Sequence, residues 1–215
     1  SRAAAKAFFF KGTNRAMFRF TMVNHLCTDL EQIKDITRPP DRIRQDVSRS
    51  PGGDSRIFLN NCIGCHSGMD PMVQAFAHYD FSGTDEARDA AGRLTYDASK
   101  VVDKYHINKN NFEWGYVTPD DHWNNYWRAG QNTYLGWSSS LPGAGTGAKS
   151  LGEELANSDA FAKCQVEKVF KAVCLRAPAD ANDRVQVASM VGNFKNNDYR
   201  LKQVFAEAAV YCKGD

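Results

Sequence analysis

The sequence has no run of about 18 apolar residues, the least that a membrane-crossing helix needs. The apolar stretch at residues 7–10 is far too short, so we expect no membrane span. Net charge is also low, because 27 basic and 25 acidic residues leave a formal charge of +2. Such an even balance argues against a strong electrostatic partner such as nucleic acid. Internal repeats, heptad runs and low-complexity tails are lacking too, which excludes solenoid and coiled-coil architectures.

What the sequence does contain predicts a mainly α chain with a short hairpin in its middle. Residues 13–33 have the spacing of a helix, with Phe18, Met22 and His25 on its inward face. The last third of the chain is strongly helical and predicts three helices, near residues 153–175, 181–194 and 198–212. The length of 215 residues is enough to bury a core without help from metals or disulfides.

Capping residues predict where the helices between these two regions begin and end. Asp54 or Ser55 is expected to cap a helix that ends at Gly68. Asp70 is expected to cap the next short helix, with Pro71 in its first position.

The region that follows, residues 81–150, is rich in Gly, Asn, Asp and aromatic residues and has little periodicity. One short helix is predicted within it, with Thr118 as cap, Pro119 at the start and Gly130 at the end. The rest would make a poor independent domain, so we expect it to wrap around something.

The strongest motif lies at residues 58–72, "FLNNCIGCHSGMDPM", where Cys62, Cys65 and His66 form Cys-x-x-Cys-His. This is the attachment signature of c-type haem: both thiols bond to the haem and the adjoining histidine reaches the iron as the proximal ligand. A structural zinc site would need a second close pair of ligands, and Cys164 and Cys174 are ten residues apart. A thioredoxin-like redox pair would need a strand before the motif, whereas here a helix is predicted. We therefore expect one covalent haem c.

Such attachment usually takes place outside the cytoplasm, so we expect a periplasmic or extracellular protein. Six cysteines fit that compartment, because two serve the haem and an even number remains for disulfides. Four buried free thiols are the alternative. The chain starts without Met and without a complete signal peptide, which fits a mature chain or a part of a larger protein.

The helical periodicity also suggests how the four remaining cysteines pair. If the last three helices run up, down and up, Cys174 and Cys212 lie at the same end. Cys164 is then about 15 Å away along its helix, too far to bridge to either. We expect Cys174–Cys212, with Cys27–Cys164 tying the N-terminal helix to the last three.

The second axial ligand of the iron is less directly indicated. Met69 and Met72 follow His66 too closely to reach the opposite face of the haem. His25, on the predicted inward stripe, is the favoured ligand, and His106 and His122 are alternatives. A site without a second protein ligand remains open as well.

Five arginines lie between residues 38 and 56, and the simplest interpretation is a solvated basic face. Alternatively, one or two of them bind the haem propionates, because guanidinium pairs well with carboxylate. Arg49 and Arg56, the nearest to the motif, are the candidates.

Two segments resemble a known family. "CIGCHSGMDPMVQAFAHYDF" resembles the haem segment of large planctomycete-type c cytochromes, in which Met-Asp-Pro follows the haem motif as residues 69–71 do here. Phe76, Ala77, Asp80 and Phe81 follow the next block of that pattern loosely, without the glycine that the family has after Met-Asp-Pro. Residues 161–168 match the Phe-Ala-x-Cys-x-Val-x-Lys run of the helical domain that comes next in the family, after a middle section that is longer here. The resemblance implies a monohaem c-type cytochrome.

Together these observations predict cytochrome-c-like haem-binding helices, a long aromatic-rich loop region and a C-terminal helical bundle. We expect one compact unit over residues 1–215, made of 1–80 with the N-terminal helix and haem segment, 81–150 as the wrap, and 151–215 as the bundle. The expected function is electron transfer, with other redox proteins as partners, and an enzymatic activity is left open as the less favoured interpretation. The oligomeric state is left open.

Two other functions remain open. One is a haem enzyme or sensor with an open distal face, similar to a peroxidase. The other is a structural haem subunit of an extracellular assembly, since aromatic residues are enriched at interfaces. The aromatic residues in question are Trp114, Tyr116, Trp123, Tyr126, Trp127, Tyr134 and Trp137.

Overall fold

The computed structural model describes residues 2–84 and 91–213 and is mainly helical, as predicted, with two small antiparallel sheets. The α-helices are α1 Arg2–Phe9, α2 Arg15–His25, α3 Ser55–Ile57, α4 Ile63–Val73, α5 Gly147–Ala156, α6 Asp159–Cys174, α7 Ala181–Asn196 and α8 Leu201–Cys212. The strands are β1 Tyr79–Ser82, β2 Arg93–Tyr96, β3 His122–Asn124 and β4 Ala144–Thr146. The remaining helical segments are a π-helix at Phe58–Cys62 and 3₁₀ turns at Leu30–Gln32, Pro51–Gly53, Gln74–Phe76, Asp103–His106, Lys109–Asn111, Tyr126–Arg128 and Gly130–Leu135.

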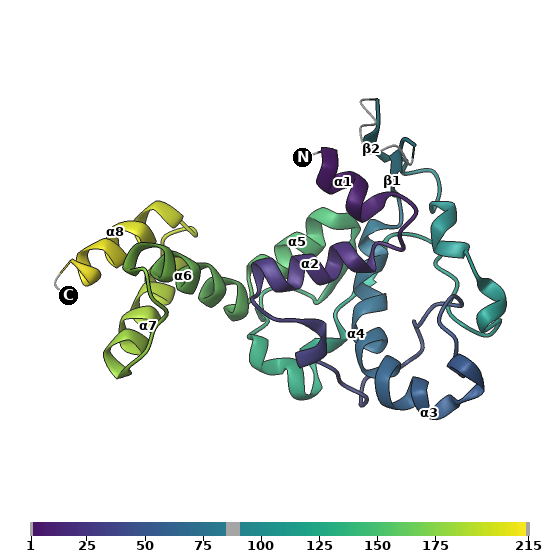
Figure 1. Cartoon of the computed structure of the whole chain (residues 1–215), viewed down its shortest axis with the longest axis horizontal. Coiled ribbons are helices and arrows are strands. Elements are labelled where there is room, and N and C mark those ends of the chain that lie inside the picture. Colours follow the sequence, from purple (N-terminus) through teal and green to yellow (C-terminus); the bar gives the residue numbers. More distant parts are fainter. Residues whose placement is uncertain (1, 85–90, 214–215) are drawn as a thin grey trace.

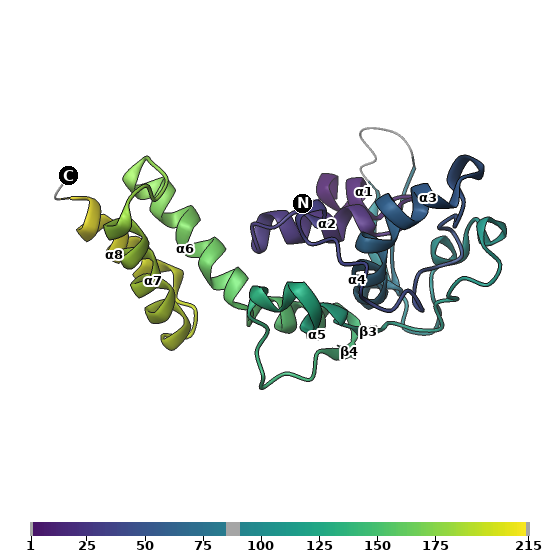
Figure 2. The ribbon, with the colours of Figure 1, turned by 90° about the horizontal axis from the view of Figure 1, so that it is seen from below.

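Two parts of the chain can be distinguished in space. Figure 1 shows α1 to α5 and the sheets gathered into one body, from which α6 leads away with α7 and α8 packed against it. The turned view in Figure 2 shows α6 as the link between them. We call residues 2–156 the body and residues 157–213 the bundle. Each has its own hydrophobic core.

The core of the body lies between α2 and α4. Phe18 and Met22 of α2 are fully buried and belong to the same cluster as Met69 and Met72 of α4. Trp127, from the middle of the chain, completes this cluster. The middle region therefore packs into the core of the body rather than only covering its surface.

Helix α4 runs without interruption from Ile63 to Val73, so the predicted stop at Gly68 and restart at Asp70 are wrong. A Cβ at Gly68 would lie 2.0 Å from Trp127 Nε1, so this glycine allows a close approach and does not end the helix. Pro71 stands inside α4, where it removes one helical N–H. Asp70 is not a cap, because its carboxylate is buried and makes tertiary contacts.

The helix predicted between Thr118 and Gly130 is also wrong. His122–Asn124 forms β3, which pairs with β4 in the register Trp123↔Gly145. Trp123 is almost fully buried and donates from Nε1 to Ser150 Oγ at 2.8 Å. Burial of this ring therefore overrides the local capping pattern. The expected hairpin is present as β1 and β2, with Tyr79 opposite Tyr96.

The three helices predicted in the last third of the chain are present, except that the first of them is two, α5 in the body and α6 in the bundle. Ser158 separates α5 from α6, and its side chain accepts a hydrogen bond from the backbone N–H of Phe161, as an N-cap does. Phe170, Met190 and Val204 form the centre of the bundle core.

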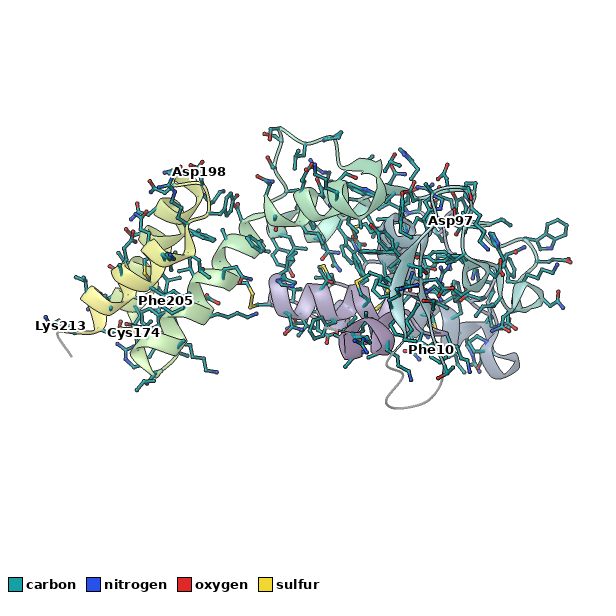
Figure 3. All side chains as sticks on the ribbon, turned by 90° about the horizontal axis from the view of Figure 1, so that it is seen from above. Phe10, Asp97, Cys174, Asp198, Phe205 and Lys213 are labelled. Atoms are coloured by element: carbon teal, nitrogen blue, oxygen red, sulfur yellow. A yellow bond between two sulfur atoms is a disulfide. The ribbon has the colours of Figure 1, made fainter. Side chains whose placement is uncertain are left out.

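The structure confirms both predicted disulfides. Cys27 is bonded to Cys164, with Cα atoms 5.3 Å apart, and Cys174 to Cys212, with Cα atoms 5.5 Å apart. The first joins the body to the bundle just beyond α2, and the second closes the bundle near its labelled Cys174 (Figure 3). The expectation that residues 1–215 form one compact unit stays a prediction.

Candidate haem-binding site

The two cysteines of the motif differ from the other four. The structure pairs Cys27, Cys164, Cys174 and Cys212 in disulfides, whereas Cys62 and Cys65 are free thiols. Both free thiols are partly buried and partly open to solvent. They are therefore the cysteines that remain available for another covalent bond.

The motif lies in helical backbone, as predicted. Asp54 caps α3 by accepting a hydrogen bond from the backbone N–H of Arg56, and the chain continues through the π-helix Phe58–Cys62 into α4. π-Helical turns are rare and are frequent at functional sites. Because the wider turn ends at Cys62, it determines the face on which the first cysteine emerges relative to Cys65 and His66.

The surroundings of the two thiols are largely apolar. Cys62 packs against the cluster of Ile43, Val47 and Phe58. Cys65 packs against the core between α2 and α4, with its Sγ 3.5 Å from the carbonyl oxygen of Leu30. These contacts suit a group whose faces are apolar.

Burial raises the pKa of the Cys65 thiol to about 11, aided by the negative charge of Glu31. The thiol is therefore protonated at neutral pH. A thioredoxin-like pair follows a strand, whereas the backbone before this motif is helical, in α3 and the π-helix. This argues against the thioredoxin-like alternative.

His66 is held by a carboxylate. Its Nδ1 lies 3.1 Å from Oδ1 of Asp70, one helical turn further along α4, and its side chain is 20% exposed. When Nδ1 carries the proton and donates it to Asp70, Nε2 has the free lone pair and can bind a metal. The described residues make no hydrogen bond to Nε2.

Asp70 belongs to a buried cluster of charges. Arg15 of α2 donates to both of its carboxylate oxygens, from Nε at 2.8 Å and Nη2 at 2.9 Å. Arg15 also binds Asp46, at 2.6 Å and 3.0 Å. Burial raises the pKa of Asp70, but the positive charge of Arg15 outweighs it, so the pKa lies well below its usual range. Asp70 is therefore ionised where it meets His66.

The candidate propionate partners Arg49 and Arg56 have other contacts. Arg56 is exposed and pairs with Asp54 at 2.7 Å. Arg49 donates to the carbonyl oxygens of Val47 and Ile43 and lies over the ring of Phe112.

Two neighbouring arginines have donors left over. Nη1 of Arg42 and Nη1 of Arg44 are buried without a hydrogen-bond partner, whereas Nε of Arg44 lies 3.6 Å from Asp46 Oδ1 in an ion pair. Arg44 is itself almost fully buried, with its guanidinium 4.5 Å from the centre of the Tyr105 ring, so the basic run is more than a solvated face. The two Nη1 donors without a partner, one on Arg42 and one on Arg44, fit a cofactor that carries carboxylates.

His25 does not point inward, and that expectation is wrong. It is the last residue of α2 and is exposed, and its carbonyl oxygen accepts a hydrogen bond from Gln165 of the bundle. The buried residues along α2 and its C-cap are Phe18, Met22 and Leu26, four positions apart, so His25 lies beside this stripe and not on it.

The other two candidate ligands, His106 and His122, are exposed as well. Nε2 of His106 lies 3.0 Å from the carbonyl oxygen of Thr118. His122 lies in β3, opposite Thr146. The described contacts bring none of these three histidines to His66.

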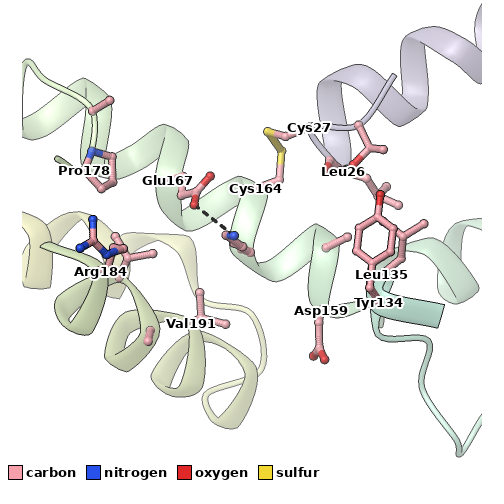
Figure 4. A pocket seen from close by; sticks show the side chains of 16 residues that line it. Leu26, Cys27, Tyr134, Leu135, Asp159, Cys164, Glu167, Pro178, Arg184 and Val191 are labelled. Carbon is pink, nitrogen blue, oxygen red and sulfur yellow. Dashed lines mark hydrogen bonds and ion pairs between the residues drawn. A yellow bond between two sulfur atoms is a disulfide. The ribbon is translucent and has the colours of Figure 1, made fainter. Parts of the chain in front are cut away.

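A groove lies elsewhere, where the body meets the bundle. Its volume is about 880 Å³, and Figure 4 shows it beside the Cys27–Cys164 disulfide, with the ion pair of Lys163 and Glu167 on its wall. Tyr134 and Arg184 also line it, whereas Cys62, Cys65 and His66 do not. The groove is therefore separate from the motif.

The roles of Asp70 and Arg15 were not predicted from the sequence. A histidine and a carboxylate four residues apart on one helix are neighbours, which could have indicated the contact of His66 with Asp70. The following proline favoured a cap instead. No local pattern indicates Arg15, which is 55 residues from Asp70 along the chain.

Comparisons with protein-family models, curated proteins and solved structures found no match. Within residues 2–84 and 91–213, no three His, Cys, Asp or Glu side chains converge to hold a metal ion by themselves. In the same residues every helix is too short or too polar to cross a membrane.

Proposed function

We propose that this chain is an exported monohaem c-type cytochrome that transfers electrons. One observation carries the proposal: the two cysteines left as thiols, among six, are those of Cys-x-x-Cys-His, and the adjoining His66 is oriented through Nδ1 by Asp70. The two disulfides agree with a protein outside the cytoplasm, in the periplasm or beyond.

Each residue has a stated role. Cys62 and Cys65 bond to the haem, His66 binds its iron through Nε2, and Asp70 holds the ring in place. Arg42 and Arg44 supply donors for the propionates in preference to Arg49 and Arg56, because each of the first two has a buried Nη1 without a hydrogen-bond partner. The bound haem would supply an iron that alternates between the ferric and ferrous states and so carries one electron. The partners would be other redox proteins.

The proposal is tested by measuring whether haem stays attached to the chain after denaturation. The chain is produced in a bacterial periplasm together with a c-type maturation system, and haem is detected by mass spectrometry and by haem staining of a denaturing gel. Wild type should carry one haem, and the Cys62→Ser, Cys65→Ser double variant none. The matched control, Cys174→Ser with Cys212→Ser, removes two cysteines outside the motif and should keep its haem. Wild type without covalent haem would refute the proposal.

A second candidate is a haem enzyme or sensor with an open distal face. The exposure of His25, His106 and His122 favours it, because none of them is buried as an internal iron ligand would be. The optical spectrum separates the two. A low-spin spectrum unaffected by cyanide or carbon monoxide supports electron transfer, and a high-spin haem that binds these ligands supports the alternative.

The same spectrum tests His25 as the second axial ligand. Because His25 is exposed at the end of α2, we expect the spectrum of His25→Ala to equal that of wild type. Loss of a low-spin signal in this variant, but not in His106→Ala or His122→Ala, would restore His25 as the ligand.

A further inference from the structure

The carboxylate of Asp70 is fully occupied by hydrogen bonds. Oδ1 accepts from Arg15 Nε at 2.8 Å and faces His66 Nδ1 at 3.1 Å, while Oδ2 accepts from Arg15 Nη2 at 2.9 Å and from the backbone N–H of Arg44 at 3.3 Å. A carboxylate has about four lone-pair sites, so all are used. Its side chain is also 0% exposed, so it cannot turn without breaking several of these bonds.

This arrangement fixes the imidazole as well. An imidazole that is hydrogen-bonded through Nδ1 to an immobile carboxylate has one favoured orientation and one favoured tautomer, with the proton on Nδ1. The three neighbours of the carboxylate come from α2, from the segment around Arg44 and from α4 itself, so three separate parts of the body converge on the one contact to His66.

The charges of the cluster balance. Two guanidinium groups, Arg15 and Arg44, face two carboxylates, Asp46 and Asp70. Asp46 binds Arg15 and lies 3.6 Å from Arg44 Nε, but it does not contact His66. Asp46 and Asp70 thus share a cation and differ in whether they touch the histidine.

A salt bridge with a purely structural role does not require the contact to His66. Two bonds from Arg15 and one from the Arg44 backbone already satisfy the carboxylate, and burial of an ion pair is by itself weak evidence for a stabilising role. The fourth acceptor site is directed at the one side chain of α4 that the haem motif assigns to iron. Carboxylates in this position make a histidine ligand more basic.

From this geometry we infer that Asp70 is a positioning residue for His66, which strengthens its Nε2 as an iron ligand and lowers the reduction potential of the haem. The inference rests on the proposed haem site. A stronger donor stabilises the ferric iron more than the ferrous iron, so the preference for the ferric state rises. Arg15 holds the carboxylate in the position that this requires.

The test compares Asp70→Asn with Asp46→Asn in the haem-loaded chain. Each variant removes one negative charge from the same cluster, but only the first alters the contact to His66. We expect Asp70→Asn to weaken the preference for the ferric state at least tenfold, a positive shift of about 59 mV for one electron. Asp46→Asn should shift the midpoint potential clearly less. Equal shifts would mean that charge alone acts, and would overturn the inference.

A second measurement uses wild type and does not depend on folding of the variants. In ferrous protein labelled with ¹⁵N-histidine, the Nδ1 proton of His66 should give a resolved, slowly exchanging NMR signal at strongly low field. Asp46→Asn should leave this signal in place. A rapidly exchanging Nδ1 proton in wild type would overturn the inference.

The two proposals fail in different ways. Absence of covalent haem in wild type refutes the proposed function. If haem is attached but Asp70→Asn does not change its midpoint potential, the proposed function stands and only the role of Asp70 is refuted.

Discussion

The body and the bundle differ in what fills their interiors. In the body, the buried residues include charged groups such as Asp35, Arg44, Asp70 and Glu154. In the described part of the bundle, Asp183 is the one buried charged residue, and the rest of its core is apolar. Buried ions are costly to desolvate, so a protein that needs only stability has little reason to keep many of them.

Asp70 and Asp183 show this difference within one residue type. Both carboxylates are buried and paired with an arginine, Arg15 or Arg176. Asp183 also accepts from Tyr211 and from the backbone N–H of Ala179, so it ties the loop before α7 to α8. Asp70 reaches His66 instead. The same chemistry thus joins helices in the bundle and orients a candidate ligand in the body.

The largest expected effect is on the link between the two parts. Removal of the Cys27–Cys164 bond by serine substitution opens a crosslink of 137 residues, which should cost about 5 kcal/mol by loop entropy. Because the body and the bundle have separate cores, we also expect thermal unfolding, followed by calorimetry, to split into two transitions. One unchanged transition would contradict this and favour a single cooperative unit.

Removal of the Cys174–Cys212 bond is the matched comparison. It opens a crosslink of 38 residues, so the expected cost is smaller, about 4 kcal/mol. The loss should be confined to the bundle, and the optical spectrum of the haem should not change. A changed spectrum would show that the bundle influences the site in the body.

A glycine-to-alanine pair contrasts the two parts on a smaller scale. Gly68→Ala places a Cβ 2.0 Å from Trp127 Nε1, so overpacking should cost about 1–3 kcal/mol. Gly192 in α7 has nothing within 4 Å of an added Cβ, so Gly192→Ala should stabilise the bundle by up to about 1 kcal/mol. Chemical denaturation measures both. The same sign for both variants would mean that Trp127 does not require the glycine.

The smallest expected effect concerns acid. The hydrogen bond from Arg176 is the main reason that the pKa of Asp183 is lowered. A lowered pKa in the folded state means that this contribution to stability is present above the unfolded pKa, about 3.9, and is lost as pH falls below it. We expect Asp183→Asn to reduce the drop in melting temperature between pH 6 and pH 3.

Asp159→Asn is the control for that experiment. Asp159 also pairs with a cation, Lys195, but the pair is exposed, so the control should retain the acid sensitivity of wild type. An equal reduction in both variants would mean that loss of any carboxylate suffices.

The predictions that held depend on local spacing. The bundle helices follow from apolar residues three and four apart, and the disulfide pairing follows from the same geometry carried along α6 and α8. The errors occurred where a distant ring or charge decided the outcome. Trp123 lies in a strand where a helix was predicted. Trp127 packs closely against Gly68, where a helix end was predicted.

The sequence by itself determined which side chains lie together within one helical turn of the motif. Cys65 and His66 follow Cys62 by three and four residues, so helical backbone places all three within about one turn. Only the tertiary structure decided that Arg15 meets Asp70, that Gly68 faces Trp127 and that His25 is exposed. Contacts between segments so far apart depend on how the whole chain closes around its core, and local spacing carries no information about that closure.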